Sequence, residues 1–344
     1  MVAAYAERLK MRGHEIFVVS TPIPPLSLRQ KIRFLLKEKR WPEKMSGASY
    51  FDNIDIEHKV LESFRPITKN DVPDADVVIA TLWMTAEWIN AFDNSKGLKF
   101  YFIQGYELFQ NQSIERIKST YKLPLKKIVV SKWLMDIMIE EYEDKEVSLV
   151  PNSVDYNIFN APERERQSTL TIGFMYSPLP FKGCDIIFDA LKTAREKIPR
   201  IKIIAFGAKK PISQMPLPAS TEFYYRPPQE KLRQIYSLCD IWLFGSRSEG
   251  FGLPILEALA CRTPVIATPA GAAPELLSDG GGVLLGDFTV ESMVKAITDI
   301  EVMSDFDWQT VSKQAYQKAK EYSWDDATLL FEKCLLNFLN SSRE

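Results

Sequence analysis

Short apolar runs alternate with amphipathic stretches along the chain, which predicts a protein of the α/β class. Runs rich in β-branched and aromatic residues predict the strands Glu15–Ser20, Val77–Leu82, Lys99–Gln104, Lys127–Ser131, Leu170–Met175, Ile201–Gly207, Ile241–Gly245 and Val265–Thr268. Apolar residues at helical spacing predict the helices Val2–Arg12, Thr85–Phe92, Trp133–Glu143, Cys184–Lys197, Gln229–Leu238 and Pro254–Cys261.

A turn-rich, polar segment interrupts this alternation at Pro151–Phe159 and Ala161–Ser168, as a linker would. The chain has 344 residues, which is enough for two domains. We therefore expect two doubly wound, Rossmann-like domains that face a cleft, at residues 1–152 and 153–325, and a C-terminal helix at 326–344 that packs back on the first domain. The first domain opens on a helix, so we expect its first strand and the following loop to be missing from the sequence.

Composition and charge argue against several other classes of protein. The formal net charge is −2, whereas a general nucleic-acid binder usually carries a positive excess. Two histidines exclude a histidine-rich metal site, and four widely spaced cysteines predict buried thiols in a reducing compartment. No apolar run is long enough to span a bilayer and the first residues do not resemble a signal peptide, so we expect a cytoplasmic protein.

A candidate anion site lies where a predicted strand leads into the helix that begins near residue 254. The loop contains Gly250 and Gly252, which let the backbone approach a ligand closely, and Pro254 suits the first turn of a helix. The unpaired amides at this helix start are those of Phe251, Gly252 and Leu253, and they are expected to bind an anion such as a diphosphate.

Two glutamates flank this helix start. Glu257 is one turn into the helix, where its carboxylate can accept from both hydroxyls of a ribose, and Glu249 can accept from hydroxyls of a sugar. A lone glutamate here would more often complement the helix dipole. The coincidence of two glutamates, two glycines and a proline favours a site for a nucleotide sugar, which is anionic in the middle and polyhydroxylated at both ends.

A second loop, Tyr176–Gly183, also follows a strand and precedes a helix, so it should open on the same cleft. Its Lys182 would place a cation against the diphosphate and against the charge that builds on the leaving group. A single lysine is usually a solvated surface residue, but this position favours the functional interpretation.

Together these residues resemble the retaining GT-B glycosyltransferases, family 4 in particular. Glu249–Glu257 is similar to the Glu-x7-Glu motif of that family, and the resemblance covers nearly the whole chain. Further matching segments are Ala258–Glu275, Pro151–Phe159, Lys182–Gly183 and Arg12–Glu15. The strings that look closest to rhamnosyltransferase-like bacterial members are Gln104–Glu107, Phe181–Gly183 and Arg226–Gln229.

The resemblance implies roles for individual residues. Glu249 would contact the donor sugar and Lys182 the diphosphate at the reacting centre, while Glu257 would bind the ribose. The other donor-binding residues implied are Gly250, Phe251, Gly252, Leu253, Arg247, Arg226 and Pro228. The acceptor-side residues implied are Gln104, Tyr106 and Glu107. Neither a metal nor a cofactor is expected, since the nucleotide sugar is itself a substrate.

The chain departs from the family at one charged position. The family usually has an arginine five or six residues before the phosphate-binding lysine, where this chain has Ser177 and Tyr176. We expect the charge of Lys182 and the helix dipole to compensate, with help from Arg247. The motif Asp74-Ala75-Asp76 resembles the manganese site of GT-A enzymes, but it precedes a strand and lies at the wrong end of a parallel sheet for a ligand site.

The segment 28–41 carries six basic residues, while Leu28, Ile32, Leu35 and Leu36 repeat at helical spacing. Such a helix can lie on an anionic membrane, or it can be a solvated helix packed on its own domain. The sequence leaves both interpretations open. Membrane contact would suit a lipid-linked acceptor and would place the protein at the inner face of the membrane.

The expected function is transfer of a sugar from a nucleoside-diphosphate donor to a hydroxyl of a glycan or lipid-linked acceptor, with retention of configuration, in bacterial surface polysaccharide synthesis. Two alternatives remain at this point. One is a nucleotide-sugar epimerase on the same fold, and the other is a non-catalytic homologue that binds nucleotides or glycans.

Overall fold

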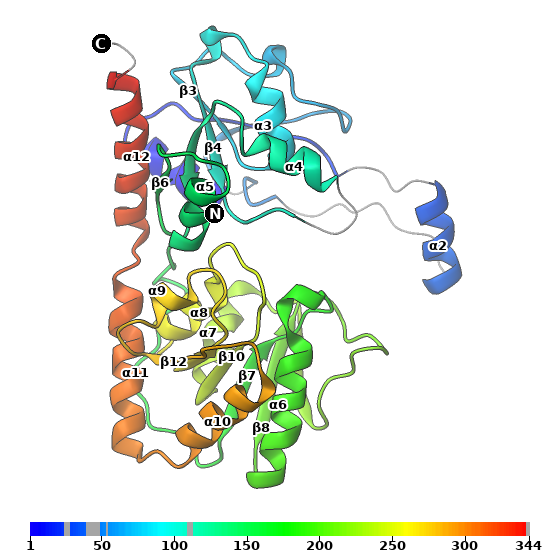
Figure 1. Cartoon of the computed structure of the whole chain (residues 1–344), viewed down its shortest axis with the longest axis vertical. Helices are drawn as coiled ribbons and strands as arrows, with labels where there is room; N and C mark the ends of the chain where they lie inside the picture. The colour runs from blue at the N-terminus through cyan, green and yellow to red at the C-terminus, as the bar shows by residue number, and fades with distance from the viewer. Residues whose placement is uncertain (24–27, 39–48, 53, 109–112, 342–344) are drawn as a thin grey trace. The chain divides into compact units, whose positions relative to one another are not determined.

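A computed structural model describes residues 1–23, 28–38, 49–52, 54–108 and 113–341 (Figure 1). The chain divides into two compact units. The first unit consists of Met1–Ile103, Glu107–Ile128 and Thr328–Glu344, and the second of Gln104–Tyr106 and Val129–Ala327. Residues 129–152, which the sequence analysis assigned to the first domain, therefore group with the second unit.

The first unit combines short strands with helices. Its helices are α1 (Val2–Met11), α2 (Leu28–Glu38), α3 (Trp83–Asn90), α4 (Ile114–Thr120) and most of α12 (Trp324–Ser341), with single 3-10 turns at Lys69–Asp71 and Asn94–Lys96. Its strands are β1 (Phe17–Ser20), β2 (Glu57–Val60), β3 (Val77–Ala80), β4 (Leu98–Ile103) and β5 (Lys126–Val129).

These strands form two sheets among the described residues, whereas the sequence predicted one. Strand β1 pairs in parallel with β2, and the other sheet has the order β3-β4-β5-β6, in which β6 is Ser148–Leu149. Strand β2 was not predicted because its residues are polar and mostly exposed, as is common for an edge strand.

The core of the first unit brings together residues from near the beginning and near the end of the chain. The ring of Tyr5 on α1 packs edge-on against Phe102 of β4, at 5.5 Å between centroids, and lies 4.7 Å from Phe331 of α12. Glu332 on α12 accepts from Arg12 at 2.9 Å and lies 2.7 Å from the ring nitrogen of His14. The last helix is therefore an integral part of this unit.

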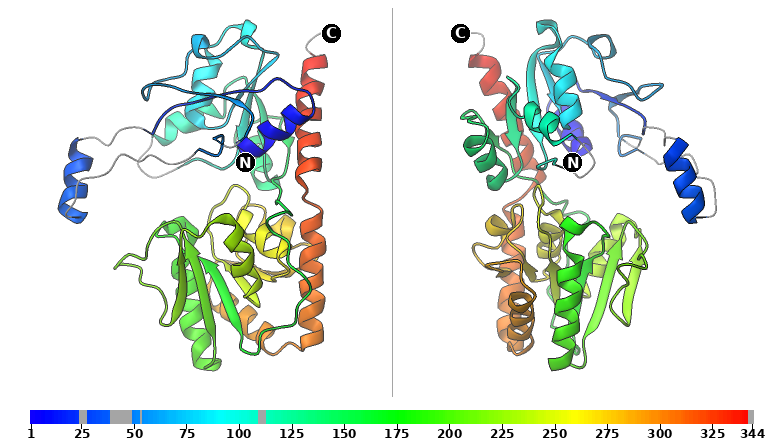
Figure 2. Two further views of the ribbon diagram at one scale, coloured as in Figure 1. Left: turned by 180° about the vertical axis from the view of Figure 1, so that it is seen from behind. Right: turned by 45° about the vertical axis from the view of Figure 1, so that its right-hand side comes forward.

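The second unit is a doubly wound α/β domain (Figure 2). One sheet of this unit contains β7 (Thr171–Met175), β8 (Lys202–Gly207), β9 (Thr221–Tyr225), β10 (Ile241–Phe244), β11 (Val265–Ala267) and β12 (Gly282–Leu284). Its helices are α5 (Lys132–Glu140), α6 (Cys184–Lys197), α7 (Gln229–Ser237), α8 (Leu253–Ala260), α9 (Ala273–Leu276), α10 (Val290–Glu301) and α11 (Asp305–Lys320), with a 3-10 turn at Pro180–Lys182.

The strand order of this sheet is β12-β11-β10-β7-β8-β9, and every neighbouring pair is parallel. The chain winds outward from β7 to β9, then returns to the centre at β10 and winds the other way. The order therefore reverses between β7 and β10, and ligands of such sheets bind outside the carboxyl ends of the strands at this switch point. The loops 176–183 and 245–252 leave those two strand ends, as the sequence predicted.

Apolar side chains bury one face of this sheet against α6 and α10. Phe174 of β7 and Leu243 of β10 face Ile187 of α6 and Ile297 of α10 in one buried cluster. On the opposite face, Trp242 packs edge-on against Tyr236 of α7, with ring centroids 4.4 Å apart. Helices on both faces leave the strand ends as the accessible edge of the sheet.

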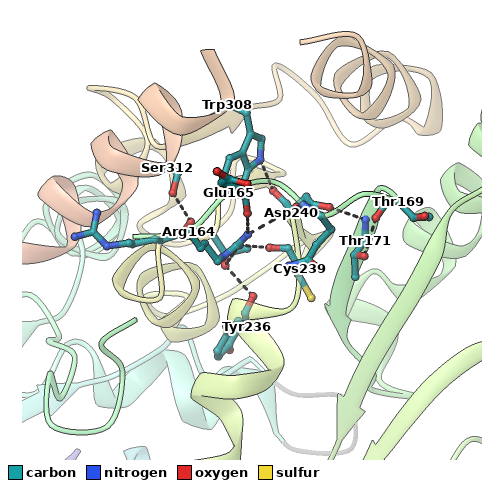
Figure 3. A network of polar contacts seen from close by, with 12 residues as sticks. Arg164, Glu165, Thr169, Thr171, Tyr236, Cys239, Asp240, Trp308 and Ser312 are labelled. Carbon is teal, nitrogen blue, oxygen red and sulfur yellow. Dashed lines mark hydrogen bonds and ion pairs between the residues drawn. The ribbon is translucent and has the colours of Figure 1, made fainter. Parts of the chain in front are cut away.

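A buried polar network fixes the predicted linker to the second unit (Figure 3). Asp240, which is fully buried, accepts from the amides of Gln167 and Thr171 at 2.9 Å each. The guanidinium of Arg164 lies 3.7 Å from the same carboxylate, and the ring nitrogen of Trp308 donates to the Asp240 carbonyl at 3.1 Å. The linker therefore belongs structurally to the second unit.

Candidate functional site

The two loops at the switch point touch each other through a pair of glycines. A Cβ atom on Gly183 would lie 1.7 Å from the carbonyl oxygen of Gly245, and Gly183 has a φ of +62°. The amide of Arg247 also donates to the carbonyl of Phe181 at 2.7 Å. Only glycine permits this approach, so the backbone itself holds the loops together.

The predicted cation and the predicted sugar-binding carboxylate are in direct contact. Lys182 Nζ lies 2.6 Å from Glu249 Oε1, and Ser246 Oγ donates to the same oxygen at 2.8 Å. Both charged side chains are partly buried. Each group is therefore satisfied by the other, and a ligand that binds both must replace this ion pair.

Helix α8 begins beside this ion pair. Gly252 precedes its first residue, Leu253, with a φ of +103°, and a proline lies in the first turn. The amides of a first turn have no acceptor within their own helix, which makes them donors for an anion. The side chain of Phe251 is buried and its carbonyl accepts from Ala272 at 2.7 Å, so only the backbone of Phe251 is suited to ligand contact.

Glu257 lies one turn into α8 and accepts a hydrogen bond from the hydroxyl of Tyr236 at 2.7 Å. Burial raises the pKa of Glu257 to about 7, and the Tyr236 hydrogen bond opposes this rise. The group therefore changes charge near neutral pH. A carboxylate with one fixed hydroxyl donor still has acceptor capacity for ribose hydroxyls.

Arg247 is engaged elsewhere. Its guanidinium donates to both carboxylate oxygens of Asp185, at 2.8 and 2.6 Å, and to the carbonyl of Pro180 at 2.8 Å. The hydrogen bonds to Asp185 raise the pKa of Arg247, so Arg247 stays protonated. The negative charge of the Asp185 carboxylate balances its positive charge. The predicted contribution of Arg247 to diphosphate binding would require it to leave Asp185, so in the unliganded protein Arg247 connects the two loops instead.

The predicted base-binding loop follows β9 at the same edge of the sheet. Arg226 is exposed and has a φ of +46°, and its amide donates to the carbonyl of Gly207 at 2.9 Å. Pro228 immediately precedes α7. Both residues thus lie at the carboxyl ends of the strands, on the side of β7 away from β10.

Two residues that were not predicted from the sequence hold the loop 245–252. Ser131 Oγ and Trp133 Nε1 both donate to the carbonyl of Gly250, at 2.7 and 3.1 Å. The carbonyl of Gln104 also packs against Gly250, because a Cβ atom there would lie 1.8 Å from its oxygen. Ser131 lies just beyond the carboxyl end of β5, and that position is the one signal that could have identified it.

The other predicted acceptor-side residues occupy different environments. The Tyr106 hydroxyl donates to Glu141 at 2.8 Å and lies 2.9 Å from the Tyr142 hydroxyl. Glu107 is buried in the first unit, where it accepts from the amide of Trp83 at the start of α3, at 2.8 Å. Burial raises the pKa of Glu107 to about 7. These contacts hold Glu107 at the start of α3, and its predicted contact with an acceptor stays a prediction.

No cluster of three potential metal ligands occurs among the described residues. Asp74, in the acidic motif set aside above, pairs with Lys96 at 2.8 Å. Within the same part of the chain, no helix combines the length and apolar content that crossing a bilayer requires.

Replacing Gly250 with alanine is expected to displace the loop, because the added methyl group would overlap the Gln104 carbonyl. We expect nucleotide affinity to fall by at least tenfold, about 1.4 kcal/mol. Calorimetric titration with nucleoside diphosphates would measure this change. Gly286, where a Cβ atom meets nothing within 4 Å, provides the matched control, and equal affinities of the Gly250→Ala and Gly286→Ala variants would contradict the expectation.

The doubly wound sheet and its solved neighbours define the fold as GT-B, the fold of a large class of glycosyltransferases. Residues 158–321 match the family model of glycosyl transferases group 1. The sucrose-phosphate synthase of Thermosynechococcus elongatus superposes with a TM-score of 0.72 at 17% identity, over 99% of this chain and 93% of its own. HepE of Anabaena, in complex with UDP and glucose, superposes with a TM-score of 0.70 at 17% identity, over 93% and 99%.

Curated relatives match mainly over part of the chain. The D-inositol 3-phosphate glycosyltransferase of Mycobacterium marinum is 26% identical over 215 residues, which is 56% of this chain and 45% of the relative. The O-antigen chain mannosyltransferase B of Escherichia coli is 31% identical over 102 residues, which is 29% of this chain and 26% of the relative. The chain thus spans about half the length of the Mycobacterium marinum relative and about a quarter of the length of the Escherichia coli relative.

Proposed function

We propose that this protein is a glycosyltransferase that moves a sugar from a nucleoside-diphosphate donor to a hydroxyl acceptor. The observation that carries the proposal is the contact between Lys182 and Glu249 beside the start of α8, with Glu257 one turn away. These groups offer a cation, helix amides and two carboxylates within one strand-end site. A ligand with a diphosphate between a sugar and a ribose matches each of them in charge and hydrogen bonding.

The same groups account for the chemistry. The acceptor hydroxyl oxygen forms a bond to the anomeric carbon and releases its proton. The bond between that carbon and the diphosphate breaks, and the diphosphate departs with the electron pair and gains negative charge. Lys182 and the first-turn amides of α8 stabilise that charge, and a fixed set of donors of this kind provides a large share of catalysis in other enzymes. Reaction without a metal or a cofactor is therefore part of the proposal.

The finer assignments rest on similarity. Retention of configuration is inferred from the likeness of Glu249–Glu257 to the Glu-x7-Glu motif of glycosyltransferase family 4. Similarity to a D-inositol 3-phosphate glycosyltransferase and to an O-antigen chain mannosyltransferase supports a polyhydroxylated acceptor, and the second relative supports a role in a bacterial surface glycan. We propose the cytoplasm as the site of reaction, with a glycan or lipid-linked acceptor and Gln104 and Tyr106 on the acceptor side.

The deciding experiment screens nucleoside-diphosphate sugars by thermal shift and incubates each hit with and without glycan acceptors in the presence of EDTA. We expect a glycosidic product whose new bond keeps the donor's anomeric configuration, as read by NMR. A changed sugar in the absence of an acceptor would show an epimerase instead. Binding of nucleotides without turnover, by this chain or by a version extended at its N-terminus, would contradict an enzymatic role.

Nucleotide affinity should depend on the charge of Glu257. Ribose hydroxyls that donate to this carboxylate favour its charged form, so affinity should rise as pH increases through the pKa of about 7. Between pH 7 and pH 6 the charged fraction of Glu257 falls from about one half to about one tenth, so affinity should fall about fivefold, and the loss should approach about tenfold per pH unit only below pH 6.

The Glu257→Gln variant isolates this effect, because the phosphates of the ligand titrate equally with both proteins. Calorimetry with a nucleoside diphosphate at pH 6, 7 and 8 should give weaker binding for Glu257→Gln at pH 8 and a smaller pH dependence. Equal pH profiles for the variant and the unmodified protein would rule out Glu257 as the ribose ligand.

A further inference from the structure

Helix α2, Leu28–Glu38, exposes its apolar face. Leu28, Ile32, Leu35 and Leu36 have 68%, 45%, 38% and 78% of their surface exposed. Their spacing of four, seven and eight residues from Leu28 puts all four side chains on one face of the helix. A helix of a globular unit normally buries such a face, as α1 does with Tyr5 and Leu9. The described residues of the first unit leave the apolar face of α2 exposed.

Basic residues border this face. The helical period places Arg29 and Arg33 along one edge of the apolar stripe and Lys31 along the other. The sequence from residue 28 to residue 37 contains no acidic residue, although the whole chain has a net charge of −2. Positive charge is therefore concentrated around the one exposed apolar stripe of this helix.

We propose that α2 binds the surface of an anionic lipid bilayer. The apolar face would enter the boundary between head groups and acyl chains, and the flanking cations would pair with anionic head groups. The charge pattern favours lipid over a second copy of this chain, because two such helices would bring like charges together. The proposal does not depend on the catalytic assignment, since none of these residues belongs to the donor site.

Residues 39–41 of the predicted segment 28–41 lie outside the described residues. The described part of the helix already provides both required features. Its apolar stripe supplies affinity for a membrane interface, and its cations supply the preference for anionic lipid.

Co-sedimentation with vesicles tests the proposal directly. The full chain is mixed with vesicles of phosphatidylcholine containing phosphatidylglycerol and with vesicles of phosphatidylcholine alone. We expect binding to the anionic vesicles, weaker binding at high salt, and at least about tenfold weaker partitioning to neutral vesicles.

Two variants separate the contributions. Ile32→Glu/Leu36→Glu removes the apolar stripe, and Arg29→Glu/Arg33→Glu reverses one charged edge; each should lower partitioning to anionic vesicles at least about tenfold. The matched control is Val302→Glu/Phe306→Glu, which places two glutamates at positions that are each 77% exposed in the second unit. Circular dichroism melting and nucleotide affinity should be unchanged in all three variants.

Equal binding of the α2 variants and the control to anionic vesicles would overturn the proposal, as would equal binding of the unmodified protein to neutral vesicles. Sedimentation velocity provides the remaining outcome. The unmodified protein could form a dimer that the Ile32→Glu/Leu36→Glu substitutions dissociate, and fail to bind vesicles. That result would identify a second copy of the chain as the partner of α2 and would also overturn the proposal.

Discussion

Replacing Lys182 with alanine is expected to lower the turnover number about a hundredfold to a thousandfold, as removal of one fixed donor to a developing anion does elsewhere. The ammonium of Lys182 lies 2.6 Å from Glu249, at the edge of the helix start proposed to hold the diphosphate. Charge on the leaving group is greater in the transition state than in the bound donor, so the turnover number should fall more than donor affinity does.

Steady-state kinetics at saturating donor would measure this effect. Lys192→Ala, at an exposed position on α6, is the matched control and should leave the turnover number unchanged. Removal of Lys182 also leaves Glu249 without its cation, so the double variant Lys182→Ala/Glu249→Gln should be more stable to heat than Lys182→Ala alone. A loss of turnover smaller than threefold in Lys182→Ala would exclude Lys182 from leaving-group stabilisation.

Replacing Asp240 with alanine is expected to destabilise the second unit by about 3–5 kcal/mol, because the change removes a fully buried carboxylate and leaves the partly buried Arg164 cation without its ion-pair partner Asp240. The amides of Gln167 and Thr171 would also lose their acceptor. The measurement is urea unfolding followed by tryptophan fluorescence, since Trp242 and Trp308 are both fully buried in this unit.

Asp299 provides the control for Asp240. It pairs with Lys295 on α10, where both side chains are more than half exposed, so Asp299→Ala should cost about 1 kcal/mol or less. Similar unfolding midpoints for Asp240→Ala and Asp299→Ala would mean that the buried network does not fix the linker.

The strands that position the site were predictable because they are buried on both faces. Ile241–Phe244 and Thr171–Met175 form continuous apolar runs, which central parallel strands require. The edge strands gave no such pattern. Thr221–Tyr225 alternates weakly with exposed residues, and Gly282–Leu284 has only three residues, so neither was predicted.

The residues proposed for the donor site were identifiable for a different reason. Glu249, Glu257 and Lys182 lie in loops and a helix start whose local sequence indicates anion binding. Their partners could not be predicted, because the pairing of Lys182 with Glu249 joins residues 67 positions apart. The hydrogen bonds from Ser131 and Trp133 to Gly250 likewise depend on tertiary structure, and the position of Ser131 just beyond a strand end is the one local signal for them.

The contact between Lys182 and Glu249 also bears on how a product leaves. A nucleotide sugar brings hydroxyls for Glu249 and a diphosphate for Lys182 together, so both members of the ion pair gain a substitute. After transfer the nucleoside diphosphate retains only the anionic part, and Glu249 is again available to Lys182. The carboxylate then competes with the diphosphate for the same ammonium, so re-formation of the ion pair with Lys182 opposes retention of the spent nucleotide.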